Sequence, residues 1–141
     1  PLSVMPGSNN GELFSHYDED GNFVGAVSDT DMAAQDMDNI AGPTGPEGTV
    51  LALNCRTLHG SKSNATDRVR PILLYVYTSA DAFPWTYPPT LTGLSSQIVR
   101  GKPAEYSHMD PRPCPVPPDW SKTCYGLIFT SQEDGDGGTM M

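Results

Sequence analysis

Glycine and proline interrupt this sequence so often that no long helix fits between them. The 141-residue chain holds 14 glycines and 14 prolines, together about a fifth of its residues and well above average usage. Residues 111–118 contain five prolines in eight positions, which favours polyproline II or irregular structure there. The composition therefore argues against a helical bundle and predicts a turn-rich chain that is mostly β or irregular.

The charge of the chain narrows the classes of partner. Seventeen acidic and eight basic side chains give a formal net charge of −9 at pH 7. Surfaces that bind nucleic acid or anionic membranes need clustered Lys and Arg, and the basic residues here are mostly scattered. No apolar run approaches the ~18 residues of a membrane span. We therefore expect no nucleic acid and no membrane as a partner.

The cysteines and the first residues indicate the cellular setting. Cys55, Cys114 and Cys124 are odd in number and widely spaced, which fits neither a disulfide framework nor a zinc site. No basic start followed by an apolar stretch marks a secretory signal. These features predict reduced thiols and a cytoplasmic protein. The chain opens at Pro1 rather than Met, in a short apolar stretch, so we interpret it as a fragment.

Local signals predict short elements in the first third of the chain. Residues 2–5 are short and apolar and are expected to form a strand, and the dense turn signal of residues 6–11 ends it. Asp20-Gly21 is a turn-forming dipeptide that favours a hairpin. Within the segment 28–40, the cap-like residues Asp29 and Thr30 predict one short helix. Residues 41–48 are rich in Gly and Pro and are expected to form a loop.

The most informative stretch begins after this loop. Residues 49–58 are a strand candidate. Because alternate residues of a strand share a face, one row of mostly apolar residues lies on the same face as His59. That row consists of Leu51, Leu53, Cys55 and Thr57. A polar loop over 60–67 leads to a second candidate strand over 69–79, in which Arg70 shares a face with apolar residues. If the two strands pair antiparallel, His59 and Arg70 look into the same interior.

A histidine and an arginine in one β interior suit a particular chemistry. Neutral imidazole is a good Fe(II) ligand, and two His with one carboxylate form the facial triad of non-haem oxygenases. A chelating 2-oxo acid with a distal carboxylate then needs a fixed, bidentate cation, to which an arginine such as Arg70 is suited. A short hydroxyl such as that of Ser61 can add a second hydrogen bond to that carboxylate. Arg68 has the same parity as Arg70 and is the second choice, and a hydrogen-bonded buried histidine is the alternative for His59.

Two segments resemble one protein family. Residues 53–66 read Leu-Asn-Cys-Arg-Thr-Leu-His-Gly-Ser-Lys-Ser-Asn-Ala-Thr and are followed by Arg70. This resembles the distal iron-binding segment of the phytanoyl-CoA dioxygenase family, and its wording is most similar to the ectoine hydroxylase branch. Residues 1–8 resemble the strand before the Pro-Gly-Ser-His turn of the family, with Asn9 where His is usual. Residues 45–50 resemble the entry to the distal strand, so the resemblance covers about residues 1–80.

The resemblance implies an Fe(II)- and 2-oxoglutarate-dependent dioxygenase that hydroxylates a small-molecule substrate. It implies a mostly β fold: residues 1–88 as the C-terminal part of a double-stranded β-helix of the jelly-roll or cupin-like kind, and residues 89–141 as a Pro/Gly-rich extension with an acidic tail. His59 would be the distal iron ligand, Arg70 the partner of the 2-oxoglutarate carboxylate and Ser61 its helper. The His-x-Asp iron pair is expected upstream of this chain, and Gly or Ala in place of its Asp would imply halogenation.

Two alternatives stay open on the sequence. His16-Tyr17-Asp18 is itself a His-x-Asp, but it follows the Pro-Gly-Ser turn in a polar segment, so we interpret it as a solvated loop. The second alternative is a non-catalytic β-helix or cupin-like binding or scaffold domain, because Asn9 replaces the usual His and one of three metal ligands is present.

Several further residues are expected to have no role in chemistry. We interpret Arg56 and Lys62 as solvated and His108 as exposed. Residues 125–130 are a candidate for a last short strand, and the acidic, glycine-rich residues 133–138 are interpreted as a solvated tail.

Overall fold

The computed structural model describes residues 2–85, 93–95, 97–113, 116–117 and 119. The chain divides into two compact units, and the boundary in the described residues lies between Thr66 and Asp67. Each unit is described by itself below.

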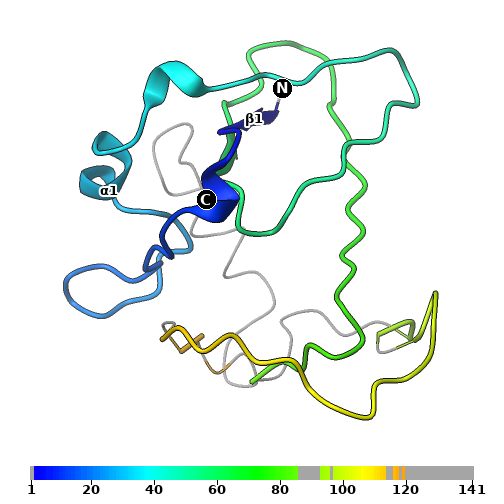
Figure 1. The fold of residues 1–141 in the computed structure, drawn as a ribbon. Helices are drawn as coiled ribbons and strands as arrows, with labels where there is room; N and C mark the ends of the chain where they lie inside the picture. The colour runs from blue at the N-terminus through cyan, green and yellow to red at the C-terminus, as the bar shows by residue number, and fades with distance from the viewer. Residues whose placement is uncertain (1, 86–92, 96, 114–115, 118, 120–141) are drawn as a thin grey trace. The chain divides into compact units, whose positions relative to one another are not determined.

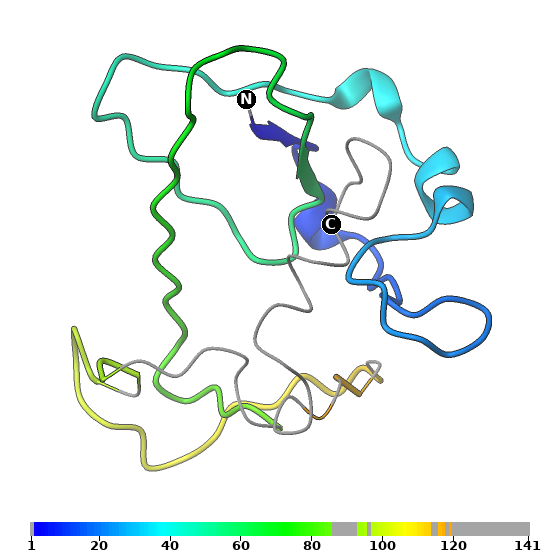
Figure 2. The same cartoon turned by 180° about the vertical axis from the view of Figure 1, so that it is seen from behind.

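The first unit is built on a two-stranded antiparallel sheet. Strand β1 spans Leu2–Val4 and strand β2 spans His59–Ser61, and the two lie side by side (Figures 1 and 2). Val4 is opposite His59 and Leu2 is opposite Ser61. The N–H of Met5 donates to the carbonyl of Leu58 at 2.9 Å, so the pairing continues one step beyond the sheet. The strand predicted for residues 2–5 is confirmed.

A tight turn follows β1. Gly7 has φ 84°, a left-handed conformation that costs little only without a Cβ. The 3₁₀ helix η1, Ser8–Asn10, follows directly. The turn predicted for residues 6–11 is therefore confirmed, and it folds the chain back toward the residues before β2.

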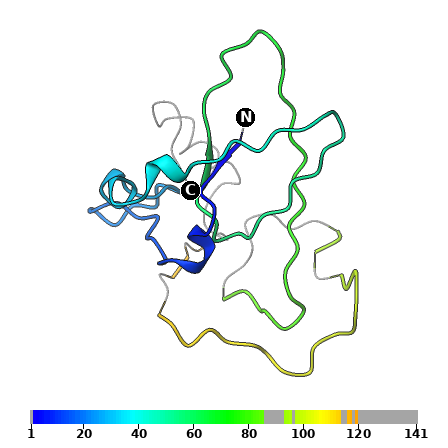
Figure 3. The same ribbon diagram turned by 45° about the horizontal axis from the view of Figure 1, so that its top comes forward.

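The helix predicted within residues 28–40 forms as two short pieces. Helix α1 spans Asp29–Ala33, and the Ser28 hydroxyl caps it by accepting from the N–H of Asp31 at 3.0 Å. The 3₁₀ helix η2 spans Met37–Asn39. Both lie to one side of the sheet (Figure 3). Ala41 then forms a bridge with Val4, which returns the chain to the open edge of β1.

The core of the first unit is small. Among the described residues, four apolar side chains are buried, and the Phe14 ring packs against them. They are Met5, Val27, Met32 and Leu58. Two of them follow or precede a strand directly, so the same contacts that bury apolar surface also hold β1 and β2 together.

The segment before α1 closes into a hairpin-like loop. Tyr17 and Phe23 form an isolated antiparallel bridge, and their rings meet edge to face at 5.5 Å between centroids. Between them the Asp18 carboxylate accepts from both the backbone N–H and the side-chain amide of Asn22, at 2.7 and 3.1 Å. Gly21 has φ 82°. The turn predicted at Asp20-Gly21 is confirmed.

The strand predicted over residues 49–58 does not form. The N–H of Thr57 donates to the Asn54 carbonyl and the N–H of Arg56 to the Asn54 side chain, each at 2.9 Å. This turn interrupts the period of two, because alternation holds only along continuous extended backbone. As a result Leu53 is 42% exposed while Leu58, on the opposite parity, is 4% exposed.

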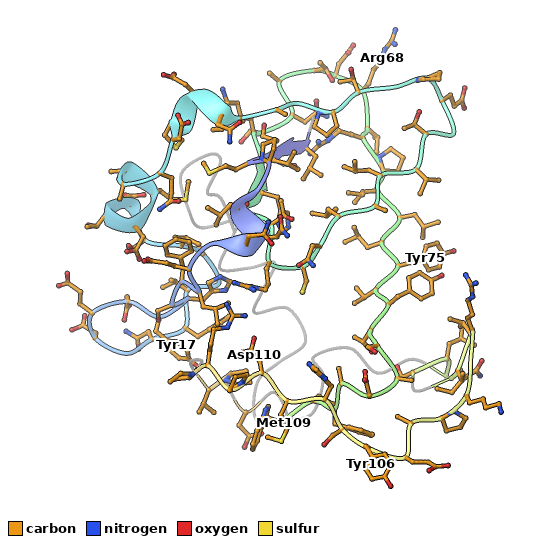
Figure 4. The ribbon with its side chains drawn as sticks, in the orientation of Figure 1. Tyr17, Arg68, Tyr75, Tyr106, Met109 and Asp110 are labelled. Carbon is orange, nitrogen blue, oxygen red and sulfur yellow. The ribbon has the colours of Figure 1, made fainter. Side chains whose placement is uncertain are left out.

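The second unit contains an extended segment. Residues 69–78, green in Figure 1, run in a zigzag but belong to no strand in the described part of the chain. A β-strand needs a hydrogen-bonded neighbour, and the strand that pairs with β2 is β1. The large apolar side chains of this segment are exposed, and that of Tyr75 projects from the backbone (Figure 4). The strand predicted over 69–79 is therefore not found in the structure, and its pairing with residues of the first unit stays a prediction.

Some expectations stay predictions. Two paired strands neither show nor exclude a double-stranded β-helix, and nothing tests a domain boundary at residue 88. The strand over 125–130, Cys114, Cys124 and the tail over 133–138 lie outside the described residues. Cys55 is a free, exposed thiol. In the described part of the chain, no helix has the length and apolar character needed to cross a membrane.

Candidate functional site

His59 is the first residue of β2, and one of its two ring nitrogens forms a hydrogen bond with the backbone. Its side chain is half-buried, and Nδ1 lies 2.7 Å from the carbonyl oxygen of Thr57. A carbonyl oxygen can only accept, so Nδ1 carries the proton in this contact. In a neutral ring with this proton, the lone pair resides on Nε2. This tautomer is the one that a metal-binding histidine takes when a backbone carbonyl orients its ring.

The turn before β2 supplies that carbonyl. The two hydrogen bonds that Asn54 accepts bend the chain at residues 54–57. The turn ends where Leu58 enters the core and bonds to Met5. Thr57 is thereby held between a closed turn and a buried neighbour, which explains how its carbonyl can aim at a side chain two residues further on.

Ser61 shares a strand with His59. It is the last residue of β2, two positions after His59, and residues two apart on a strand point to the same face. Ser61 is exposed. The structure therefore brings these two predicted site residues to one face of one short strand.

Arg70 and Arg68 lie in the second unit, and both are exposed. Arg70 lies near the start of the extended segment, and Arg68 directly precedes that segment and projects away from the chain (Figure 4). His59 lies in the first unit and Arg70 in the second, so the role of Arg70 beside His59 stays a prediction.

The His16-x-Asp18 pair sits inside the hairpin-like loop. The His16 ring is half-buried beside the Phe23 ring, 6.2 Å between centroids, and burial lowers the pKa of His16. The Asp18 carboxylate is occupied by Asn22, whose hydrogen bonds lower the pKa of Asp18. Both side chains thus have contacts within the loop, as expected of a loop rather than a metal pair.

The described residues do not form a complete metal site. Among them, no three His, Cys, Asp or Glu side chains lie close enough together to hold a metal ion. His59 fits the chemistry of a single ligand, because Nδ1 is anchored by the Thr57 carbonyl and Nε2 is the nitrogen that would bind a metal.

Arg56 is the residue for which the sequence interpretation was wrong. It is half-buried, and its Nη2 donates to the Gly11 carbonyl at 2.7 Å. Its Nε is buried and has no hydrogen-bond partner among the described residues. No local signal could have shown this, because the acceptor lies 45 residues away. Lys62 and His108 are exposed, as predicted.

Two curated proteins are similar to this chain. One, from Stutzerimonas stutzeri, is named a probable alpha-ketoglutarate-dependent hypophosphite dioxygenase and is 34% identical over 135 residues, 93% of this chain. The other, from Stutzerimonas stutzeri strain A1501, is named an ectoine dioxygenase and is 47% identical over 38 residues, 27% of this chain. No family model matches the chain, and no solved structure does.

The chain spans less than half the length of these relatives. The matched region makes up 46% of the first protein and 13% of the second. The similarity nevertheless extends along almost all of this chain in the first case. The chain is thus similar to proteins named as dioxygenases, which supports the general reaction type expected from its sequence.

Proposed function

We propose that the protein carrying this chain is an Fe(II)- and 2-oxoglutarate-dependent dioxygenase that hydroxylates a small polar molecule. The observation that supports it most directly is the His59 ring, whose Nδ1 is bound by the Thr57 carbonyl so that Nε2 can serve as a ligand. The names of the two relatives support the reaction class. Hypophosphite and ectoine, the compounds in those names, are both small and polar.

Each predicted residue has one task in this proposal. His59 holds the iron through Nε2, and the remaining ligands are the expected upstream His-x-Asp. Arg70 binds the distal carboxylate of 2-oxoglutarate through a planar, permanently charged fork, and Ser61 donates its hydroxyl to the same carboxylate. Iron with 2-oxoglutarate supplies the oxidising power for C–H hydroxylation, and this chain supplies position and charge.

Two variants of the full-length protein separate these tasks. His59→Gln is expected to lose metal binding, because an amide cannot replace imidazole at that position. Arg70→Ala is expected to weaken 2-oxoglutarate binding about 10–100-fold, the equivalent of one charge-assisted hydrogen-bond pair, with metal affinity unchanged. Isothermal titration of the metal and, separately, of 2-oxoglutarate measures both. Equal losses of both ligands in Arg70→Ala would contradict the assignment.

The non-catalytic alternative has its own test. An oxygenase consumes 2-oxoglutarate in the presence of Fe(II) even without its substrate, at a slow uncoupled rate, and releases succinate. Succinate above the level of the His59→Gln variant supports the enzyme. Succinate no higher than in that variant, from a protein that is folded, would favour a binding or scaffold domain.

A further inference from the structure

A chain of hydrogen bonds runs from the His59 ring to the turn after β1. The Nδ1–H of His59 donates to the Thr57 carbonyl at 2.7 Å. The N–H of Leu58, which belongs to the same peptide unit as that carbonyl, donates to the Ser8 hydroxyl oxygen at 2.8 Å. The Ser8 hydroxyl in turn donates to the Met5 carbonyl at 2.7 Å.

All three hydrogen bonds point in the same direction. The imidazole donates to the peptide carbonyl, the N–H of the same peptide donates to the hydroxyl, and the hydroxyl donates to the Met5 carbonyl. Hydrogen bonds in such a series polarise one another, by about 10–30% per bond. A peptide whose N–H is bound is also a better acceptor at its oxygen. The Thr57 carbonyl is therefore both better aimed and more strongly accepting than an isolated one.

Ser8 is held in place independently of His59. Gly7, in its left-handed conformation, and the 3₁₀ turn Ser8–Asn10 set its backbone. Arg56 fastens the end of this turn through Gly11, and the Asn39 side-chain amide donates to the Pro6 carbonyl at 3.1 Å. The turn is thus attached to the rest of the first unit on both sides of Ser8, which makes the hydroxyl a fixed point.

We propose that Ser8 is a positioning residue for His59, and that the series Ser8–Leu58–Thr57 selects the imidazole nitrogen that faces a metal. Without the Ser8 hydroxyl, the peptide between Thr57 and Leu58 loses its restraint at the N–H and keeps those from the Asn54 turn and the core, so its carbonyl is aimed less sharply at Nδ1. The other tautomer, with the proton on Nε2, then becomes populated and cannot bind a metal through Nε2. The assignment rests on the proposed role of His59.

The test is the tautomer of His59, read from imidazole ¹⁵N shifts in the metal-free full-length protein. The wild type is expected to show the Nδ1–H form, and Ser8→Ala a mixture of both forms. Ser8→Thr keeps the hydroxyl and is expected to restore the wild-type tautomer. For Zn²⁺ alone as the probe, the Kd of Ser8→Ala is expected to rise about tenfold, the lower end of the range for lost partners of metal-binding histidines.

Ser28→Ala is the matched control. Its hydroxyl also accepts a backbone N–H in the first unit, from Asp31 at 3.0 Å, but it has no place in the series. It is expected to lower stability while leaving the His59 tautomer and the Zn²⁺ affinity unchanged. A tautomer in Ser8→Ala identical to that in Ser28→Ala would overturn the proposal.

Two further outcomes keep the test decisive. If Ser8→Ala does not fold, Ser8→Cys, a weaker hydrogen-bonding group of similar shape, is expected to give an intermediate tautomer ratio, and an unchanged ratio overturns the proposal. If the wild type binds no metal, the proposed function fails, whereas the tautomer shift still decides the role of Ser8.

Discussion

The N–H of Leu58 donates to the hydroxyl of Ser8 across 50 residues of sequence. This bond joins the turn after β1 to the residue before His59. Together with the Met5–Leu58 backbone hydrogen bond, it means that residues about 50 positions earlier in the sequence help to orient the candidate metal ligand. Substitutions in the full-length protein can test the core, the turn after β1 and the neighbouring loop one at a time.

Leu58→Ala is expected to destabilise the protein by about 2–4 kcal/mol, because it removes a side chain from the small core and leaves a cavity. Leu58 is 4% exposed and packs with Met5, Val27 and Met32. Chemical denaturation measures the loss. The same substitution at Leu53, which is 42% exposed, is the control and should cost clearly less. Equal costs would show that Leu58 is not part of the core.

Gly7→Ala is expected to cost about 1–2 kcal/mol, the penalty for placing a Cβ in the left-handed region. Gly7 has φ 84° and no neighbouring atom within 4 Å of a Cβ, so backbone strain alone acts there. Gly42→Ala is the control, since Gly42 has equal space and no positive φ. Thermal unfolding compares the two variants, and a Gly7→Ala protein as stable as Gly42→Ala would contradict the turn geometry.

Arg56→Ala is expected to loosen the turn at residues 8–11 and to lower stability by about 1 kcal/mol, the typical value of one lost hydrogen bond. Hydrogen exchange should report the change first at the Gly11 amide, which donates to the Ser8 carbonyl at 2.9 Å. Lys62→Ala is the matched control, because Lys62 is exposed. Exchange at Gly11 that does not differ between the two variants would refute the Arg56 contact.

The hairpin-like loop is expected to open in acid in two stages. Burial lowers the pKa of His16 from 6.5, so the stability that His16 contributes is complete above pH 6.5 and declines as pH falls through its folded pKa. Bonds from Asn22 lower the pKa of Asp18 from 3.8, so the contribution of Asp18 declines only below pH 3.8.

Protection factors of the Val24 and Gly25 amides, which donate to the His16 carbonyl, measure this opening. His16→Gln should abolish the first stage and retain the second. It should also leave metal affinity unchanged, in contrast to His59→Gln. Loss of the metal in His16→Gln would revive the His16-x-Asp18 pair as the iron site.

The sequence allowed correct prediction where the signal was local. Gly7 and the residues around it indicated the first turn, Asp20-Gly21 the second and cap-like residues the start of the helix, because each of these depends on neighbours a few residues away. The cap itself was assigned to Asp29 and Thr30, whereas Ser28 caps α1. The candidate site could be predicted only as residue types. The sequence interpretation placed Ser61 in a loop over 60–67, whereas the structure places His59 and Ser61 on one face of β2.

Alternation placed Leu58 outside and Leu53 inside, because it assumes continuous extended backbone, and the local turn that Asn54 closes at residues 54–57 breaks that continuity. The other errors depend on distant contacts. Arg56 was misjudged because its acceptor, Gly11, is remote in sequence. The pairing of β1 with β2 likewise depends on core packing between segments that are far apart in the sequence, and a local sequence pattern does not reveal such packing.

The long sequence separation between β1 and β2 affects how the protein is made. Closing a loop of 50 residues costs about 3.5 kcal/mol of chain entropy before any contact compensates for it. A ribosome adds about 5–20 residues per second, so β1 is synthesised several seconds before β2. During that interval its edge and the Met5 side chain lack their final partners. The histidine site is accordingly among the last features of the first unit to form on the ribosome, and nascent chains arrested before residue 58 should be recognised by chaperones that bind exposed apolar strands.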